Sequence, residues 1–308
     1  MSQQAPFAST TQQQAPDPDK PLIWLDGKIV PRSQAVVNVY DHGLLYGDGV
    51  FEGIRVYNGR IFKAASHINR LFRSAERIRL TIPYSREEFD ALMRETLKAN
   101  NLRDAYIRLV VTRGVGTLGL HPFRCPKPGV FCIADKIQLY PVEMYRDGMP
   151  IIVAKRPRIP IECLDPRIKS LNYLNNILAK IEAIDAGVLE ALMLNVDGEV
   201  AECTGDNIFI INDGRVFTPP SEAGILEGVT RAFVFDLCRE LRISIEEKSL
   251  YLKDVLSADE VFLTGTAAEV IAVSRIDDTS IGNGAEGPVT KRIREAFKAA
   301  VANDAPED

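Results

Sequence analysis

Lys169 is the residue whose position most strongly suggests covalent chemistry. It lies in the segment 167–176, which reads Arg-Ile-Lys-Ser-Leu-Asn-Tyr-Leu-Asn-Asn, just ahead of apolar residues at helical spacing. A lysine partly withdrawn from water has a lowered pKa, because burial disfavours the charged ammonium. Its neutral amine can then attack a carbonyl carbon. Taken alone, Lys169 would be interpreted as a solvated surface charge, so the surrounding residues decide between the two interpretations.

Glu202 and three separated groups of donors are the next candidates. Glu202 ends a predicted hairpin strand in the sequence Val-Ala-Glu-Cys-Thr-Gly-Asp-Asn-Ile-Phe. The segment 226–231 opens a predicted helix, and the free N–H groups of a helix N-terminus attract anions. The segment 264–268 adds hydroxyl groups, and Arg70 adds a charge that can bind in bidentate fashion. Taken singly, Glu202 would be a charge at the end of a strand, the threonines of 226–231 and 264–268 would be helix caps, and Arg70 would be a solvated charge. Taken together, the donors favour an anion-binding site.

These segments together resemble the class IV, or fold-type IV, aminotransferases, which use pyridoxal 5'-phosphate. The resemblance extends from about Ile23 to Phe297, and within the class the branched-chain amino acid aminotransferases look most similar. It implies that Lys169 is the catalytic residue, bonded to the cofactor aldehyde, and that Glu202 keeps the ring nitrogen protonated. The cofactor-binding residues that it implies are Arg70, Lys169, Tyr173, Glu202, Leu226, Val229, Thr230 and Thr266.

The resemblance also implies a substrate pocket. The segment 41–55 is similar to the first-domain motif of the class, in which Tyr46 and Phe51 wall the pocket and Gly53 leaves room beside it. Tyr106 and Arg108 match a paired tyrosine and arginine whose arginine accepts the distal carboxylate of glutamate. The aromatic residues could instead be core residues, and Arg108 the partner of a buried acid. The implied substrate contacts are Tyr46, Phe51, Gly53, Tyr106, Arg108, Thr266, Ala267 and Ala268.

The function implied by the resemblance is transfer of the amino group of L-leucine, L-isoleucine or L-valine to 2-oxoglutarate. Such an enzyme would serve branched-chain amino acid biosynthesis as a homodimer or higher homo-oligomer, with the loop 116–120 reaching a neighbouring subunit's pocket. The alternatives are a D-amino acid or (R)-amine transaminase, an aminodeoxychorismate lyase and a non-enzymatic cofactor-binding protein. The D-amino acid enzymes carry an Arg-x-His pair after Thr-Arg-Gly, whereas here Thr112-Arg-Gly114 is followed only by His121.

A second motif, Gly-Val-Gly-Thr-Leu-Gly at 114–119, matches the dinucleotide-binding pattern Gly-x-Gly-x-x-Gly. Only residues 120–128, which contain three prolines, separate it from the next predicted strand. A parallel crossover needs a dozen or more residues, usually helical. We therefore interpret 114–119 as a loop over a pocket and not as a nicotinamide site.

The composition narrows the class of protein. The chain has 308 residues, a formal net charge of −5 and no basic stripe, which argues against nucleic-acid binding. The five cysteines contain no Cys-x-x-Cys pair, and the three histidines have no metal-ligand spacing. No apolar run has the length of a signal peptide or a membrane span. We expect a cytoplasmic protein with reduced thiols and no bound metal.

The elements that must position these residues begin with short strands and tight turns. Hairpins are predicted at 22–30 around Asp26-Gly27 and at 54–62 around Asn58-Gly59. A helix carrying apolar residues from 68 to 78 follows, and Ser85 with Glu88 forms a predicted capping box for the next helix. Further elements are expected as strands at 106–112, 129–134, 151–155 and 260–264, three strands around the turns at 197–198 and 212–214, and helices at 171–184, 230–241 and 289–301.

Helices and strands mix without a βαβ rhythm, which predicts an α+β fold with two domains. The resemblance to the fold-type IV enzymes implies two α/β domains with the cofactor site between them. We expect residues 1–20 to form a disordered tail, because they are polar and have little to bury. A small N-terminal domain is expected over 21–140, a linker over 141–150 and a large cofactor-binding domain over 151–304.

Overall fold

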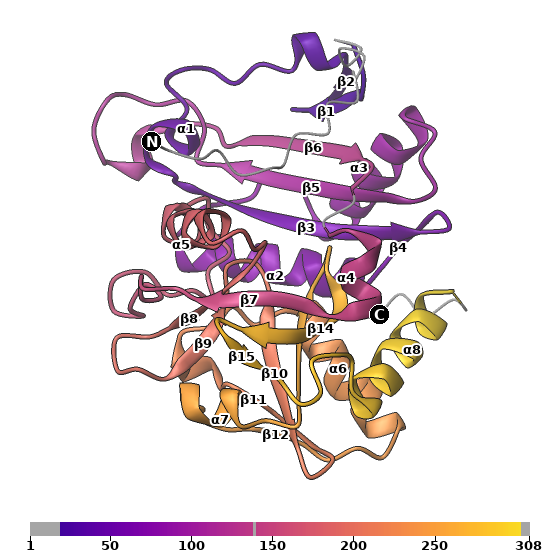
Figure 1. The fold of residues 1–308 in the computed structure, drawn as a ribbon. Coiled ribbons are helices and arrows are strands. Elements are labelled where there is room, and N and C mark those ends of the chain that lie inside the picture. The colour runs from indigo at the N-terminus through magenta and orange to yellow at the C-terminus, as the bar shows by residue number, and fades with distance from the viewer. Residues whose placement is uncertain (1–18, 138–139, 303–308) are drawn as a thin grey trace, which may run out of the picture.

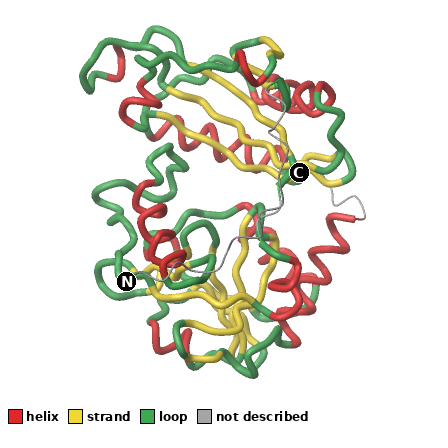
Figure 2. The backbone as a smooth tube through the Cα atoms, turned by 45° about the horizontal axis from the view of Figure 1, so that its top comes forward, coloured by secondary structure: helices red, strands yellow, loops and turns green. Residues whose placement is uncertain are grey.

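The computed structural model describes residues 19–137 and 140–302, which form two β-sheets with helices packed against each. Figure 1 shows the first sheet above the second, with α4 (Val142–Asp147) leading into β7 (Met149–Val153), the first strand along the chain of the second sheet. In a second orientation the strands again gather in two groups (Figure 2). The mixture of helices and strands confirms the predicted α+β class.

The first sheet has six strands in the order β2-β1-β6-β5-β3-β4, and every pairing is antiparallel. Its strands are β1 Ile23–Leu25, β2 Lys28–Val30, β3 Gly49–Tyr57, β4 Arg60–Ile61, β5 Ala105–Thr112 and β6 Gly129–Asp135. Both predicted hairpins are confirmed. The antiparallel pairing of β5 with β6 rules out a parallel crossover at 114–119.

Two helices cover one face of this sheet, α2 (Ala64–Arg77) and α3 (Arg86–Ala99). Their buried apolar residues, Leu71 and Phe89 among them, pack into one core with the strands. The predicted capping box is confirmed, because the Glu88 N–H donates to the Ser85 hydroxyl and the Ser85 N–H donates to the Glu88 carboxylate. These contacts fix where α3 begins.

The second sheet has the order β12-β11-β10-β13-β14-β7-β8-β9, with β15 paired to β14. Its strands are β7 Met149–Val153, β8 Ala191–Leu194, β9 Val200–Cys203, β10 Asn207–Asn212, β11 Arg215–Thr218, β12 Ile245–Glu247, β13 Glu260–Gly265, β14 Glu269–Ile276 and β15 Thr279–Ser280. Helices α6 (Val229–Glu240) and α8 (Pro288–Ala302) pack on β13 and β14 around an aromatic core of Phe209, Phe233, Phe262 and Phe297.

Some elements differ from the sequence prediction. Four strands, β8 to β11, occupy the region where three were expected, and β7 begins two residues earlier than predicted. The short helices α1 (His42–Tyr46), α4 (Val142–Asp147) and α7 (Leu252–Leu256) were not predicted, nor were β12, β14 and β15. Helix α5 spans Leu174–Asp185, and its apolar residues Leu174, Ile177, Ile181 and Ile184 are exposed instead of facing the core.

The predicted tail falls almost wholly outside the described residues, which begin at 19. Within 19–137 and 140–302, no helix has the length and apolar character needed to span a membrane. Over the same residues, no group of three or more His, Cys, Asp or Glu side chains is arranged to hold a metal ion.

Candidate active site

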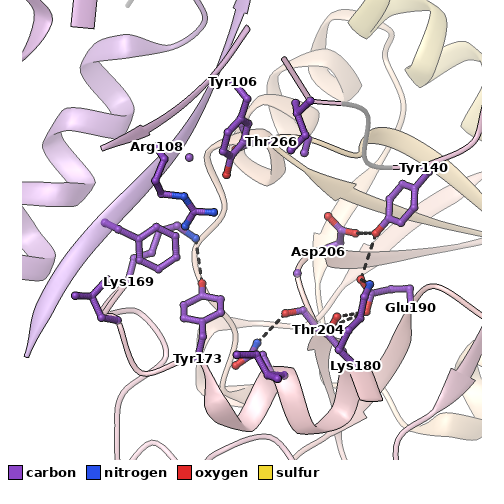
Figure 3. Close-up of a pocket in the computed structure, with 18 residues that line it drawn as sticks. Tyr106, Arg108, Tyr140, Lys169, Tyr173, Lys180, Glu190, Thr204, Asp206 and Thr266 are labelled. Carbon is purple, nitrogen blue, oxygen red and sulfur yellow. Dashed lines mark hydrogen bonds and ion pairs between the residues drawn. The ribbon is translucent and has the colours of Figure 1, made fainter. Parts of the chain in front are cut away.

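A cavity of about 600 Å³ is lined on one side by residues of β3 and β5 of the first sheet, and on the other side by α5 and by loops next to the strands of the second sheet. Eight residues predicted from the sequence line it, namely Phe51, Gly53, Tyr106, Arg108, Lys169, Tyr173, Thr266 and Ala267. Figure 3 shows Lys169, Tyr173 and Arg108 on one side of this cavity and Tyr140, Asp206 and Glu190 on the other. The structure therefore brings together residues that are more than a hundred positions apart in the sequence.

The backbone around Lys169 is fixed to the first sheet. The Phe51 N–H donates to the Lys169 carbonyl oxygen at 3.0 Å, and the Leu171 N–H donates to the Gly49 carbonyl oxygen at 3.0 Å. The Lys169 ammonium donates to the Tyr173 hydroxyl at 3.1 Å and lies 4.7 Å from the centre of the Phe51 ring. The amine is therefore held against the cavity wall.

Gly53 and Tyr106 lie on the adjacent strands β3 and β5. Residues at i and i+2 of a strand share a face, so Phe51 accompanies Gly53 and Arg108 accompanies Tyr106. A Cβ atom at Gly53 would lie 1.9 Å from the Tyr106 hydroxyl oxygen, so only glycine leaves the phenol in place. Burial raises the pKa of Tyr106, which keeps its hydroxyl protonated as a donor.

Arg108 combines a positive charge with an aromatic neighbour. Its guanidinium carbon lies 4.4 Å from the centre of the Phe51 ring and 5.7 Å from that of the Tyr106 ring. Of the residues that the structure describes, no carboxylate forms an ion pair with Arg108, so it is not the partner of a buried acid there. The cavity wall thus offers an available cation beside an apolar ring.

Glu202 is buried on β9 and accepts hydrogen bonds at both oxygens. Its Oε1 receives the Arg158 guanidinium, with Nε at 3.0 Å and the terminal nitrogen at 2.9 Å. Its Oε2 receives the Asn207 amide at 3.2 Å and the Leu226 N–H at 3.0 Å. Burial raises the pKa of Glu202, and the charges of Arg158 and Lys169 oppose that rise. The Lys169 charge is therefore close enough to act on this carboxylate.

Arg70 is buried on α2 and forms a bidentate pair with Glu52, both contacts measuring 2.7 Å. His67 also contacts this carboxylate at 2.7 Å. Burial alone would raise the pKa of Glu52, but the Arg70 and His67 charges outweigh burial and hold it well below its usual range. Arg70 donates further to the Glu227 carbonyl oxygen at 2.9 Å, which joins α2 to the turn before α6.

The N-terminal end of α6 is a candidate anion site. The first N–H groups of a helix, here those of Val229 and Thr230, have no partner within the helix. Gly228 is the N-cap, and a Cβ there would lie 2.2 Å from the Asn207 side-chain oxygen. Thr264, which pairs with Asn207 across β13 and β10, has a buried hydroxyl without a hydrogen-bond partner among the described residues. Donors from two elements are therefore left for a ligand such as a phosphate.

Two predicted substrate residues do not line the cavity described here. The Tyr46 hydroxyl accepts the Gly119 N–H at 2.9 Å, and its ring packs edge-on against His42. Because His42 in turn contacts the Thr117 carbonyl at 2.9 Å, helix α1 and the loop 115–120 form one unit. Ala268 is fully buried in the core of the second sheet. Within one chain, both residues lie away from their predicted positions in the pocket.

Four residues that hold this site were not predicted from the sequence: Glu52, His67, Arg158 and Asn207. Glu52 and Asn207 lie inside strings that the sequence analysis singled out, next to Gly53 and five residues after Glu202. Arg158 gave no local signal, because its role depends on a contact with a residue 44 positions further along the chain. The residues 156–160 around it contain two prolines and match no motif.

Comparison with known families gives a match to Amino-transferase class IV over residues 49–276. Among curated proteins, the chain is 51% identical over 276 residues to a putative branched-chain-amino-acid aminotransferase of Methanocaldococcus jannaschii, covering 90% of this chain and 95% of the relative. It is also 36% identical over 277 residues to a D-alanine aminotransferase of Listeria monocytogenes, covering 89% and 94%.

A solved structure with the same architecture is the branched-chain amino acid aminotransferase of Thermobaculum terrenum in its PLP-form. It superposes with a TM-score of 0.83 at 31% sequence identity, covering 95% of this chain and 96% of that chain. The predicted fold type IV is therefore confirmed at the level of the whole backbone.

Proposed function

The chain belongs to the class IV aminotransferases, and from this premise we propose that it transfers the amino group of L-leucine, L-isoleucine or L-valine to 2-oxoglutarate. The products are the branched-chain 2-oxo acids and L-glutamate. The observation that carries the proposal is the pairing of Arg108 with the Phe51 ring on the wall that also holds Lys169. An apolar ring suits an aliphatic side chain, and an arginine suits the distal carboxylate of glutamate. An enzyme that takes leucine and glutamate in turn needs both.

The residues present fit pyridoxal 5'-phosphate as the cofactor. The unpartnered Thr264 hydroxyl and the free N–H groups of Val229 and Thr230 would hold its phosphate, together with Arg70 and Thr266. The PLP-form of the Thermobaculum terrenum enzyme supports this assignment. When bound, pyridoxal phosphate supplies an aldehyde that receives the amino group and a ring that withdraws electrons from the substrate Cα.

Side chains of this protein would carry out proton transfer, hold the cofactor ring and bind the substrate. Lys169 Nζ would move a proton between the substrate Cα and the cofactor carbon that receives the amino group, as a general acid and base. The Glu202 carboxylate would keep the ring nitrogen protonated, and Leu226, whose N–H donates to Glu202, would help to hold the ring. Tyr173, already hydrogen-bonded to Lys169 Nζ, orients the amine. The proposed substrate contacts are the residues that line the cavity, Phe51, Gly53, Tyr106, Arg108, Thr266 and Ala267.

We propose a homodimer or a higher homo-oligomer as the active form. On helix α5, 65% of the surface of Leu174 and 59% of that of Ile184 are exposed to solvent, and the loop residue Leu120 is 81% exposed. Exposed apolar surface of this kind is typical of an interface between subunits. Tyr46 and the loop 116–120, which lie together, would complete the pocket of the neighbouring subunit. This arrangement explains why Tyr46 lies outside the cavity of its own chain.

We further propose that the two sheets belong to two domains, 21–140 and 151–304, joined by the segment 141–150. A cytoplasmic location is supported by the five cysteines, all of which are free thiols.

The second candidate is a D-amino acid transaminase, favoured by the D-alanine aminotransferases among the relatives. Arg108 beside Phe51 and the lack of an Arg-x-His pair after Gly114 argue against it. An (R)-amine transaminase, an aminodeoxychorismate lyase and a protein that binds the cofactor without turnover are further alternatives within the same site.

One panel of amino donors separates these functions. The holoenzyme is incubated with 2-oxoglutarate and L-leucine, L-valine, D-alanine or an (R)-aryl amine, and L-glutamate and D-glutamate are measured separately. We expect glutamate from L-leucine and L-valine only. Glutamate from D-alanine alone would replace the branched-chain proposal by the D-amino acid one. Borohydride reduction followed by peptide mapping should fix the cofactor on Lys169, and a label on another lysine would contradict the assigned site.

A further inference from the structure

Two buried carboxyl groups face the site cavity on the side away from Arg108 (Figure 3). Glu190, which precedes β8, is 1% exposed, and Asp206, between β9 and β10, is 4% exposed. The Tyr140 hydroxyl lies 2.9 Å from Asp206 Oδ2 and 3.3 Å from Glu190 Oε2. A hydroxyl has one hydrogen to donate, so Tyr140 satisfies only one of the two carboxylates at a time.

The two acids have different surroundings. Glu190 accepts hydrogen bonds from the Thr204 and Ala191 N–H groups and the Thr204 hydroxyl, and the Lys180 ammonium lies 3.4 Å from its Oε2. These donors stabilise a negative charge on Glu190.

The Tyr140 hydroxyl donates to Oδ2 of Asp206. The other oxygen, Oδ1, packs against the backbone of Gly265, where an added Cβ atom would lie 1.9 Å from it. Burial and the charge of Glu190 raise the pKa of Asp206 to about 7, with the charge of Glu202 adding to the rise and Tyr140 and Lys180 opposing it. Cys203 on β9 and Tyr145 on α4 are further titratable neighbours of Asp206. Asp206 is therefore the member of the pair that can gain or lose a proton under working conditions.

The proposed function requires the cavity wall at Asp206 to tolerate two kinds of substrate side chain, one neutral and one negatively charged. A neutral aliphatic side chain is indifferent to a carboxylate across the cavity, whereas the distal carboxylate of glutamate or 2-oxoglutarate is repelled by it. Arg108 attracts that carboxylate from one side, and an ionised Asp206 opposes it from the other. In a buried site such a repulsion is poorly screened, so the charge state of Asp206 affects which substrate binds.

Resting on the proposed function, we propose that Asp206 is a specificity-determining residue that takes up a proton when a dicarboxylate substrate enters and gives it back when an aliphatic substrate replaces it. A protonated Asp206 can donate to the Tyr140 oxygen, which is within reach at 2.9 Å. The Tyr140 hydrogen is then free to be donated elsewhere in the cavity. One site would thereby accept both charge types without moving its backbone.

The test is proton uptake on binding of two unreactive ligands to the holoenzyme. Glutarate represents the dicarboxylate and 4-methylvalerate the aliphatic monocarboxylate. Calorimetric titration in two buffers of different ionisation enthalpy gives the number of protons taken up. At about pH 7.5, we expect glutarate to take up roughly 0.3 to 1 proton more than 4-methylvalerate, and at about pH 6 we expect a difference near zero, because Asp206 is already mostly protonated while both ligands are still mostly ionised.

The variant Asp206→Asn should abolish the difference at the higher pH, and Asp197→Asn, an exposed carboxyl group in the turn between β8 and β9, should preserve it. Equal uptake for both ligands, a difference that persists in Asp206→Asn, or failure of glutarate to bind would overturn the proposal.

A second measurement needs no variant. In the unaltered enzyme, kcat/KM is measured for glutamate and for leucine at each pH, and their ratio is taken. Groups that act in both reactions, such as Lys169, change both values equally, so their pH dependence cancels in the ratio. This ratio should fall as the pH rises above about 7, by up to roughly tenfold per unit. A ratio independent of pH would overturn the inference while leaving the aminotransferase proposal intact. Absence of any turnover with 2-oxoglutarate would instead mark failure of the proposed function itself.

Discussion

The two oxygens of Glu202 have different neighbours, and this asymmetry matters for its role. Oε1 is bound by the Arg158 guanidinium, whereas Oε2 is bound by the neutral Asn207 amide and the Leu226 N–H. Arg158 also donates to the Asn176 side chain on α5 at 3.0 Å, so the acid is tied to the helix that follows Lys169. A neutral side chain at 202 would leave the Arg158 charge uncompensated in the same place.

Glu202→Gln should therefore weaken electron withdrawal by the ring twice over, by removing a negative charge and by exposing the ring nitrogen to Arg158. The rate of proton loss from the Cα of L-leucine should fall on the order of a hundredfold or more in single-turnover measurements. Cofactor absorbance should remain, since the phosphate site is untouched. Glu199→Gln on the preceding turn is the control. Near-normal rates in Glu202→Gln would mean that another acid serves the ring.

Arg108→Ala tests dual substrate recognition at the wall beside Phe51. A charge-assisted bidentate contact to a distal carboxylate should be lost, whereas leucine loses only a neighbour. The expected selective loss for glutamate and 2-oxoglutarate is about 2–4 kcal/mol in kcat/KM. Arg103→Ala, exposed ahead of β5, is the matched control. An equal loss for leucine and glutamate would show that Arg108 is structural.

Individual residues were predictable where they lie in contiguous strings. Lys169 with Tyr173, and Tyr106 with Arg108, are separated by four and two positions, and each pair meets at the cavity as expected. Arg158 and Asp206 were not predicted as site residues, because the contacts that give them a role join segments distant in the sequence. Gly53 lies on the cavity wall, and the space beside its Cα is occupied by the Tyr106 phenol, a contact that the sequence did not specify.

Among the helices and strands, α3 begins with a capping box, Ser85 with Glu88, that allows its first residue to be predicted from the sequence. Ser85→Ala removes the hydroxyl that accepts the Glu88 N–H, and should destabilise the holoenzyme by about 1 kcal/mol. Urea denaturation at fixed protein and cofactor concentrations measures the change. Transamination should be unaffected, because α3 packs on the first sheet and does not line the cavity described here. Ser280→Ala on the exposed β15 is the control. An equal loss of unfolding free energy in that variant would show that the Ser85 cap does not stabilise α3 specifically.

Other elements were less predictable, for physical reasons. Strands joined by Asp-Gly or Asn-Gly turns were found, because the turn chemistry is local. Strand β14 was missed because the segment before it was interpreted only as a donor-bearing turn. Helix α5 was predicted from apolar spacing, but its apolar face points to solvent in the single chain. Periodicity identifies an apolar face and does not specify whether the same chain or another one covers it.

At the scale of the whole molecule, the exposed face of α5 carries the prediction of assembly. The double substitution Leu174→Glu and Ile184→Glu should give a folded monomer by sedimentation and circular dichroism. Activity should fall at least about tenfold, because the neighbouring subunit's Tyr46 and loop would be lost from the pocket. Val196→Glu, an equally exposed apolar residue in the turn between β8 and β9, is the control and should leave assembly unchanged. A double variant that stays dimeric would place the interface elsewhere.

The attachment of Lys169 to β3 has a consequence for how substrates come and go. The lysine follows β7 in the sequence, yet its carbonyl oxygen and the Leu171 N–H are bonded to the edge of the first sheet. The same strand supplies Phe51 to the wall that the amine rests on. A clamshell motion that swung the two sheets apart would break both backbone bonds and carry the amine away from its own wall. We therefore expect substrate to enter and leave past the loops at the rim of the cavity, while the two sheets stay joined through Lys169 and Leu171.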